Sequence, residues 1–199
     1  MSPQLAKDTY CSYCGKAFTT SGYPRTCEGC STVIWSNPIP VVVALQPVRL
    51  NGKKGLLTVR RAIQPRKDLL ALVGGFLEDH ETYRDGGARE MREETGVIVE
   101  PSSLRPFWFT STDPRPNRVL LFVEGDPLEA SALPPAVVNA ETSERGLVFG
   151  PRGLAEVFAF PLHARAAERW FLAHGIDGEH AFVSCLLYTS PSPRDRTRS

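Results

Sequence analysis

Three glutamates within five residues are the part of this sequence best suited to chemistry. Glu90, Glu93 and Glu94 occupy positions i, i+3 and i+4 of a predicted helix, so their carboxylates project from one helical face. Like charges at this spacing repel one another, and a bound divalent cation would neutralise them. Mg²⁺ is typically held by carboxylates together with substrate phosphates and water. The spacing therefore predicts a Mg²⁺ (or Mn²⁺) site, with a solvated acidic surface helix as the alternative.

The residues around these glutamates are suited to holding them in place. Arg89 lies four residues before Glu93 and can pair with that carboxylate. Gly75 follows another glycine, where the backbone can turn sharply and present a carbonyl oxygen. Gly96 comes two residues after Glu94 and is a good helix stop. The stretch 75–97 is therefore predicted to form a turn, a helix and a second turn.

The same stretch resembles the Nudix box, G-x5-E-x7-R-E-U-x-E-E-x-G-U, where U is a bulky aliphatic residue. Every fixed position is filled, by Gly75, Glu81, Arg89, Glu90, Met91, Glu93, Glu94, Gly96 and Val97. The resemblance implies a pyrophosphohydrolase that cuts nucleoside diphosphates linked to another moiety, using Mg²⁺ or Mn²⁺. The cation ligands it implies are Glu90, Glu93, Glu94 and the carbonyl of Gly75. Arg89 would orient a glutamate, and Glu81 would be a structural or outer-shell acid.

The resemblance leaves the general base open between a glutamate of the box and an acid of a later loop. Glu144, just before a predicted strand, is the best later candidate, with Glu141 behind it. A solvated loop acid is the alternative for both. His80 adjoins Glu81 but fills a variable position of the box.

Four of the five cysteines form a second constellation, C-x2-C-x12-C-x2-C, consisting of Cys11, Cys14, Cys27 and Cys30. Two CxxC turns can close a tetrahedral four-thiolate shell around Zn²⁺. So short a segment cannot fold by apolar burial alone, which favours a structural zinc ribbon. Two disulfides or a redox CxxC pair are the alternatives. Nucleic-acid binding by the ribbon is not expected, because it offers only Lys16 and Arg25 as cations.

Composition places the chain among ordinary globular proteins. Hydrophobic residues make up 42% of the chain, charged residues 23%, and the formal net charge is +1. A charge near zero gives no global attraction to nucleic acid. No apolar run reaches the roughly 18 residues needed to span a bilayer, and the first ten residues lack the apolar core of a secretory signal. A cytoplasmic protein that does not bind membranes is therefore expected.

The predicted elements alternate in type along the chain. Strands are expected at residues 41–48, 55–61, 107–110, 119–123 and 147–149, and helices in the box and at 161–174, while residues 69–73 lead into the glycine turn before the box helix. Asn51-Gly52 predicts a hairpin turn. This order favours a mixed sheet between helices, an α/β/α sandwich, and the Nudix resemblance implies the same fold. The predicted domains are a zinc ribbon at 8–36 and a Nudix domain at 37–183.

Residues 184–199 change composition to Ser, Pro, Thr and Arg. They are predicted to be disordered, and they resemble read-through into non-native sequence. Cys185 is therefore treated as incidental.

The ribbon followed by NPIPVVVAL resembles Nudix proteins with an N-terminal zinc ribbon, including NADH pyrophosphatases. Those enzymes carry an SQPWPFP-x-S run, whose Ser-Gln-Pro-Trp part is absent from residues 109–117. NADH, ADP-ribose, FAD or a similar metabolite therefore stay open as the small-molecule nucleotide substrate. Arg115 and Arg118 can bind a phosphate and Trp108 can stack on a base. Surface arginines and a core aromatic are the alternatives.

Two other functions compete with a metal-dependent pyrophosphohydrolase. One is a non-catalytic Nudix-fold sensor or regulator that binds a nucleotide, although such a protein has no need of three aligned carboxylates. The other is an RNA-end hydrolase that uses the ribbon for binding. Many members of the family that the chain resembles are homodimers, which makes a homodimer possible, but the sequence itself does not give the oligomeric state.

Overall fold

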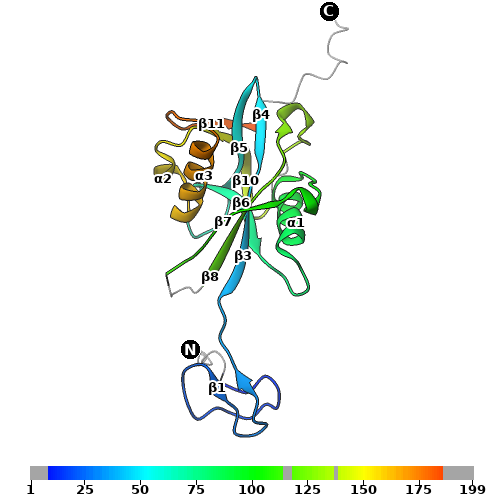
Figure 1. Cartoon of the computed structure of the whole chain (residues 1–199), viewed down its shortest axis with the longest axis vertical. Helices are drawn as coiled ribbons and strands as arrows, with labels where there is room; N and C mark the ends of the chain where they lie inside the picture. The colour runs from blue at the N-terminus through cyan, green and yellow to red at the C-terminus, as the bar shows by residue number, and fades with distance from the viewer. Residues whose placement is uncertain (1–8, 114–117, 137–138, 186–199) are drawn as a thin grey trace, which may run out of the picture. The chain divides into compact units, whose positions relative to one another are not determined.

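The computed structural model describes residues 9–113, 118–136 and 139–185. The chain divides into two compact units, Met1–Pro38 and Ile39–Ser199 (Figure 1). In the smaller unit, β1 (Arg25–Thr26) pairs antiparallel with β2 (Val33–Ile34).

The larger unit contains the remaining elements. Its strands are β3 (Ile39–Leu45), β4 (Pro47–Leu50), β5 (Lys53–Arg61), β6 (Leu70–Phe76), β7 (Arg105–Ser111), β8 (Arg118–Glu124), β9 (Leu128–Glu129), β10 (Thr142–Phe149) and β11 (Ala181–Ser184). Its α-helices are α1 (Tyr83–Thr95), α2 (Leu154–Val157) and α3 (Pro161–Ala173), with 3₁₀ turns η1 (Pro101–Ser103) and η2 (Ala130–Ala132).

The main sheet is mixed. Among the described residues its strands run in the order β11-β10-β5-β6-β3-β8-β7, and β4 pairs with both β5 and β9. The β3–β8 and β4–β9 pairs are parallel, whereas the other pairs are antiparallel. The Asn51-Gly52 turn joins β4 to β5 with positive φ at both residues, as its sequence predicts.

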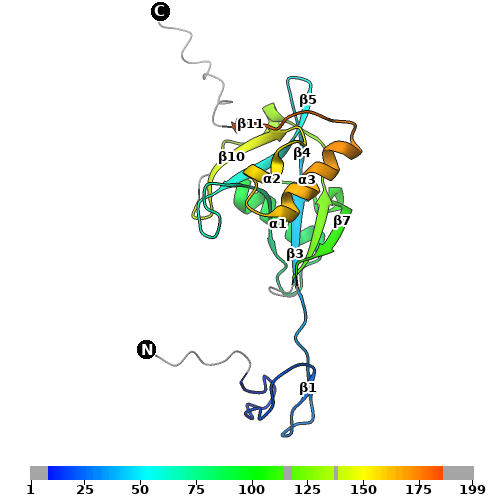
Figure 2. The ribbon, with the colours of Figure 1, turned by 90° about the vertical axis from the view of Figure 1, so that its left-hand side faces the viewer.

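Helices cover both faces of this sheet. Helix α1 contributes Met91 to a core with Val42, Leu57 and Val73. Helix α3 contributes Trp170 and Phe171 to the core on the other face. Figure 1 shows α1 on one side and α2 and α3 on the other, and Figure 2 shows α2 and α3 in front of the strands. The predicted α/β/α sandwich is therefore confirmed.

Several boundaries differ from the sequence prediction. The run 41–48 divides into β3 and β4 at Gln46, whose buried amide donates to the Asp126 carbonyl at 2.6 Å. Ser184, which the prediction placed in the tail, is the last residue of β11 and pairs with Gly146 of β10, and Cys185 is buried in the core on the α1 face. The rest of the predicted tail, 186–199, lies outside the described residues. Among the described residues, no helix is long and apolar enough to cross a membrane.

Candidate active site and cysteine cluster

Helix α1 is fixed at both ends by its own sequence. Thr82 caps the first turn, since its hydroxyl accepts from the Asp85 backbone N–H while the Asp85 carboxylate accepts from the Thr82 N–H. Gly96 ends the helix in the left-handed conformation at φ 73°, as predicted. These caps set the ends of the helix that carries Glu90, Glu93 and Glu94.

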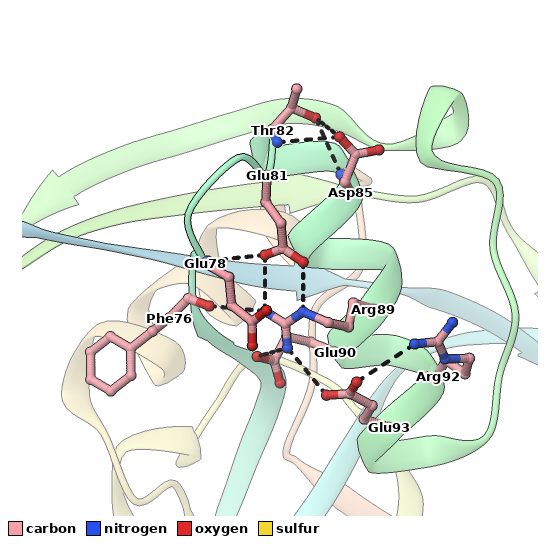
Figure 3. Close-up of polar contacts among 9 residues, drawn as sticks. All are labelled: Phe76, Glu78, Glu81, Thr82, Asp85, Arg89, Glu90, Arg92 and Glu93. Carbon is pink, nitrogen blue, oxygen red and sulfur yellow. Dashed lines mark hydrogen bonds and ion pairs between the residues drawn. The ribbon is translucent and has the colours of Figure 1, made fainter.

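Arg89 is the centre of the polar network on this helix (Figure 3). Its side chain is only 16% exposed. Its Nε and Nη2 donate to the two oxygens of Glu81 at 2.7 and 3.1 Å, and Nη2 also donates to the Phe76 carbonyl at 3.0 Å. Nη1 donates to Glu90 at 2.8 Å and to Glu93 at 3.1 Å. These five bonds use the five N–H donors of the guanidinium, so Arg89 ties the 76–81 turn to the helix.

The bonds from Arg89 also shift the pKa of Glu81, the acid of the 76–81 turn. The Arg89 guanidinium and the Glu78 backbone N–H hold the pKa of Glu81 below its usual range. Glu81 therefore stays ionised as the partner of Arg89, and none of the five donors is left to neutralise Glu94.

Glu90 and Glu94 face the end of β6. A Cβ on Gly75 would collide with the Glu90 carboxylate, so only glycine permits this approach. Glu94 accepts from the Gly74 backbone N–H, yet its Oε2 is fully buried with no hydrogen-bond partner among the described residues. Burial, and next the nearby Glu90 carboxylate, raise the pKa of Glu94 to about 8. Burial also raises the pKa of Glu90.

Glu93 is placed differently from the other two glutamates. Its side chain is 51% exposed and pairs with Arg89 at 3.1 Å and with Arg92 at 3.6 Å. Among the described residues, the three carboxylates do not converge into a ready-made ligand set as the cysteines do. The structure thus brings together Glu90 and Glu94, and turns Glu93 toward arginine and solvent.

A fourth acid reaches this group from the loop before β10. The Glu141 carboxylate lies close enough to raise the pKa of both Glu90 and Glu94. Asn139 holds this loop: its amide donates to the Glu93 carbonyl at 3.0 Å, and its side-chain oxygen accepts from the backbone N–H groups of Glu141 and Thr142. Our sequence interpretation missed Asn139, whose signal is an Asn two residues before an acid at a strand start.

Glu144, the preferred later acid, does not join this group. Arg145 donates to the Thr95 carbonyl at the end of α1, so it lies on the α1 face of the sheet. Its neighbour Glu144 must then point to the opposite face, where it pairs with Arg60 at 2.7 Å. Although burial opposes the shift, hydrogen bonds from Arg60 and Ser184 lower the pKa of Glu144.

The predicted substrate-binding residues are separated from one another. The Arg118 guanidinium lies 5.1 Å from the ring of Phe76, next to Gly75, and its buried Nε has no hydrogen-bond partner among the described residues. Trp108 stacks on Phe122 at 5.1 Å and packs against the core on the α3 face of the sheet. Arg115 lies outside the described residues.

The acids on α1 fit a divalent cation. Glu90 is paired with Arg89, but Glu94 and Glu141 have no ion pair among the described residues, and one buried oxygen of Glu94 has no hydrogen-bond partner. A hard cation with oxygen ligands would satisfy that oxygen and offset the repulsion. Glu90 and Glu94 are the residues placed to hold it.

The four N-terminal cysteines form a compact cluster. Their sulfurs all lie within 4.8 Å of one another, with Cys11–Cys30 at 3.8 Å and Cys14–Cys27 at 3.6 Å. Tetrahedral Zn–S bonds of about 2.3 Å place sulfurs roughly 3.8 Å apart. Backbone N–H groups of Tyr13 and Gly29 donate to Cys11 and Cys27, and none of the cysteines is in a disulfide. The cluster therefore fits a zinc ribbon.

We expect Cys27→Ser to release zinc and unfold the smaller unit, because Cys27 is buried at its centre and the unit has little apolar core. Zinc per chain, measured by mass spectrometry after dialysis, should fall from one to near zero. Cys185→Ser is the matched control and should keep its zinc. Equal zinc content in both variants would contradict the assignment.

Comparisons of the sequence with known proteins identify relatives of this chain. Residues 40–169 match the family model of the NUDIX domain. Over 99 residues the chain is 32% identical to the NAD-capped RNA hydrolase NUDT12 of Homo sapiens, covering 45% of this chain and 21% of that protein. Over 49 residues it is 43% identical to an ADP-ribose pyrophosphatase of Methanocaldococcus jannaschii, covering 25% and 29%. The chain thus spans less than a third of the length of these curated relatives.

A solved structure extends the similarity over most of the chain. The NUDIX hydrolase of Nitrosomonas europaea is 26% identical and superposes with a TM-score of 0.66, covering 86% of this chain and 96% of that one. With the family model spanning both cores and the box helix, the chain belongs to the Nudix hydrolase family.

Proposed function

We propose that this protein hydrolyses the phosphoanhydride bond of a nucleoside diphosphate linked to a second group, with the help of a divalent cation. Water adds to one phosphorus, the bridging oxygen leaves with the other phosphate, and two monophosphate products form. ADP-ribose and dinucleotides such as NADH or FAD are substrates of this class. The named activities of the curated relatives, an ADP-ribose pyrophosphatase and an NAD-capped RNA hydrolase, fall in the same class.

One observation carries the proposal: one oxygen of the Glu94 carboxylate, Oε2, is buried without a hydrogen-bond partner among the described residues. The same carboxylate lies beside Glu90, within reach of the charge of Glu141. An ionised carboxylate buried in this way is costly unless a cation is bound. A neutral side chain at position 94 would stabilise the fold more than a buried carboxylate does. The glutamate at this position therefore favours cation binding.

The cation, when bound, supplies Lewis acidity and lowers the pKa of a water molecule. The chain's own residues then supply orientation and proton transfer. Arg89 fixes Glu90, and Asn139 fixes the loop that carries Glu141. We assign Glu141 as the acceptor of the water proton, because it is the acid of the later loop that lies near Glu90 and Glu94.

We assign Arg118 to the diphosphate because it lies at the end of the sheet where Gly75 approaches Glu90. Its guanidinium rests on Phe76, one residue from Gly75, and its buried Nε has a donor to offer. A guanidinium fork matches phosphate oxygens well. Trp108 is too far along the sheet to share this role.

The proposal is tested with ADP-ribose, NADH and FAD at saturating Mg²⁺ or Mn²⁺, with products separated by chromatography. We expect AMP from at least one of them. Hydrolysis in H₂¹⁸O should place the label on a phosphate product, which identifies the bond that breaks. Intact substrates under every condition would overturn the proposal.

A paired substitution tests the base. We expect Glu141→Gln to lower kcat by about 10²- to 10⁴-fold, the range typical of a lost general base, with an unchanged melting temperature because Glu141 is exposed. Glu144→Gln is the matched control, because it lies three residues away on the other face of the sheet. Its kcat should stay within about threefold of wild type. The reverse ranking would return the role to Glu144.

A further inference from the structure

Two arginines of α3 meet one tryptophan of the edge strand β7. The guanidinium carbons of Arg169 and Arg165 lie 5.0 and 5.9 Å from the centre of the Trp108 ring. Trp108 also stacks on the buried Phe122, so its ring forms a platform between the core and the two cations. These contacts place Trp108 of β7 next to α3.

The two cations have no acidic partner in the part of the chain that the structure describes. Other exposed arginines do: Arg49, Arg105 and Arg152 each pair with a carboxylate at 2.5 to 3.4 Å. Arg165 and Arg169 are both exposed and lie four residues apart on α3, where like charges repel. Both cations lie over the ring of Trp108, and a bound anion would offset the repulsion between them.

Arg165, Arg169 and Trp108 lie on the same face of the sheet as Arg118. Trp108 is opposite Phe122 in the β7–β8 pairing, and Phe122 follows Arg118 by four residues on β8. Even separations keep side chains on one face, and four residues of strand span about 13 Å. That distance is longer than a diphosphate. An anion at Trp108 would therefore belong to a part of the substrate beyond the bond that is cut.

We propose that Arg165 and Arg169, held on Trp108, bind a phosphate that the substrate carries outside its scissile diphosphate. This inference rests on the proposed function. Two sources share the chemistry: a ribose phosphate on a dinucleotide, and the first phosphodiester of an RNA chain attached to one. Trp108 then positions guanidinium groups, rather than stacking on a base as the sequence suggested.

The test compares substrates that differ by one remote phosphate. One pair is ADP-ribose and ADP-ribose 2′-phosphate; the other is NAD and an NAD-capped trinucleotide. The variant is R165Q/R169Q, and the control is R105Q, which removes an exposed arginine from β7 that Asp126 already pairs. Thermal denaturation checks that each variant is folded.

We expect the wild type to prefer the phosphate-bearing member of at least one pair, and R165Q/R169Q to lose about tenfold of that preference, mostly through KM. The substrate without the extra phosphate should change by less than twofold, and R105Q should behave as wild type. The substrate pair whose preference falls identifies the source of the phosphate, a ribose phosphate or an RNA phosphodiester. Equal losses on both members of each pair, or no loss, would overturn the inference.

Calorimetric binding of the same molecules separates this inference from the proposed function. If no substrate is cut, the proposed function fails, while tighter binding of ADP-ribose 2′-phosphate or the trinucleotide that R165Q/R169Q abolishes would still support the anion site. Equal affinity of wild type and variant for both molecules would refute it.

Discussion

Glu94→Gln should lower kcat by about 10³-fold or more while leaving the protein as stable as wild type or more so. The activity falls because Gln cannot supply the charge that holds a cation, and the effect of such a catalytic cation amounts to several kcal/mol. Stability does not fall, because burial and Glu90 raise the pKa of Glu94 to about 8, so ionisation of this group opposes folding when no metal is bound. Steady-state kinetics and thermal denaturation in Mg²⁺-free buffer measure the two effects.

Glu93→Gln is the matched control for this substitution. It changes the adjacent residue in the same way, but Glu93 is half exposed and pairs with Arg89 and Arg92. We expect its kcat to fall by no more than about tenfold, as for a residue that supports a ligand. Equal losses in the two variants would show that Glu93 turns inward when metal binds.

Arg89→Gln should destabilise the protein by about 3 kcal/mol and reduce kcat by at least about 10²-fold. Removing the guanidinium leaves three carboxylates and the Phe76 carbonyl without their shared donor. Glu90 then loses its position, and the 76–81 turn is no longer tied to α1. Urea denaturation and kinetics on the same preparation measure both changes.

Arg92→Gln provides the comparison for Arg89. Arg92 lies on the same helix, is exposed, and makes one ion pair at 3.6 Å with Glu93. Such a surface pair contributes less than about 1 kcal/mol. A stability loss in Arg92→Gln as large as in Arg89→Gln would argue against Arg89 as the organising residue.

Local sequence signals were sufficient for the box helix. Thr82 with Asp85 and the glycine at 96 specify both ends of α1, and the Asn51-Gly52 turn specifies the β4–β5 hairpin. Period-two and helical patterns likewise locate β7, β8 and α3, because each of these elements is long enough to show its own pattern. The short α2 and β11 give no such signal.

Contacts between segments far apart in the chain could not be predicted from the sequence. Whether Glu141 or Glu144 meets α1 depends on the register of β10 against β5, which shifts between Thr142 and Glu144. The Arg89–Glu81 pair is also hidden, because eight residues separate its members and only the 76–81 turn brings them together. In the same way, Glu93 and Glu94 are equivalent in the motif, but burial and the hydrogen bond from the Gly74 backbone N–H distinguish Glu94.

The central claim, that Glu90 and Glu94 hold a divalent cation, is tested most directly by Mn²⁺ binding to the zinc-loaded protein, followed by electron paramagnetic resonance of free Mn²⁺. We expect the wild type and E144Q to bind at least one Mn²⁺ per chain, and E90Q/E94Q to bind none in the same concentration range. Binding of Mn²⁺ by E90Q/E94Q with the affinity of wild type would contradict the claim.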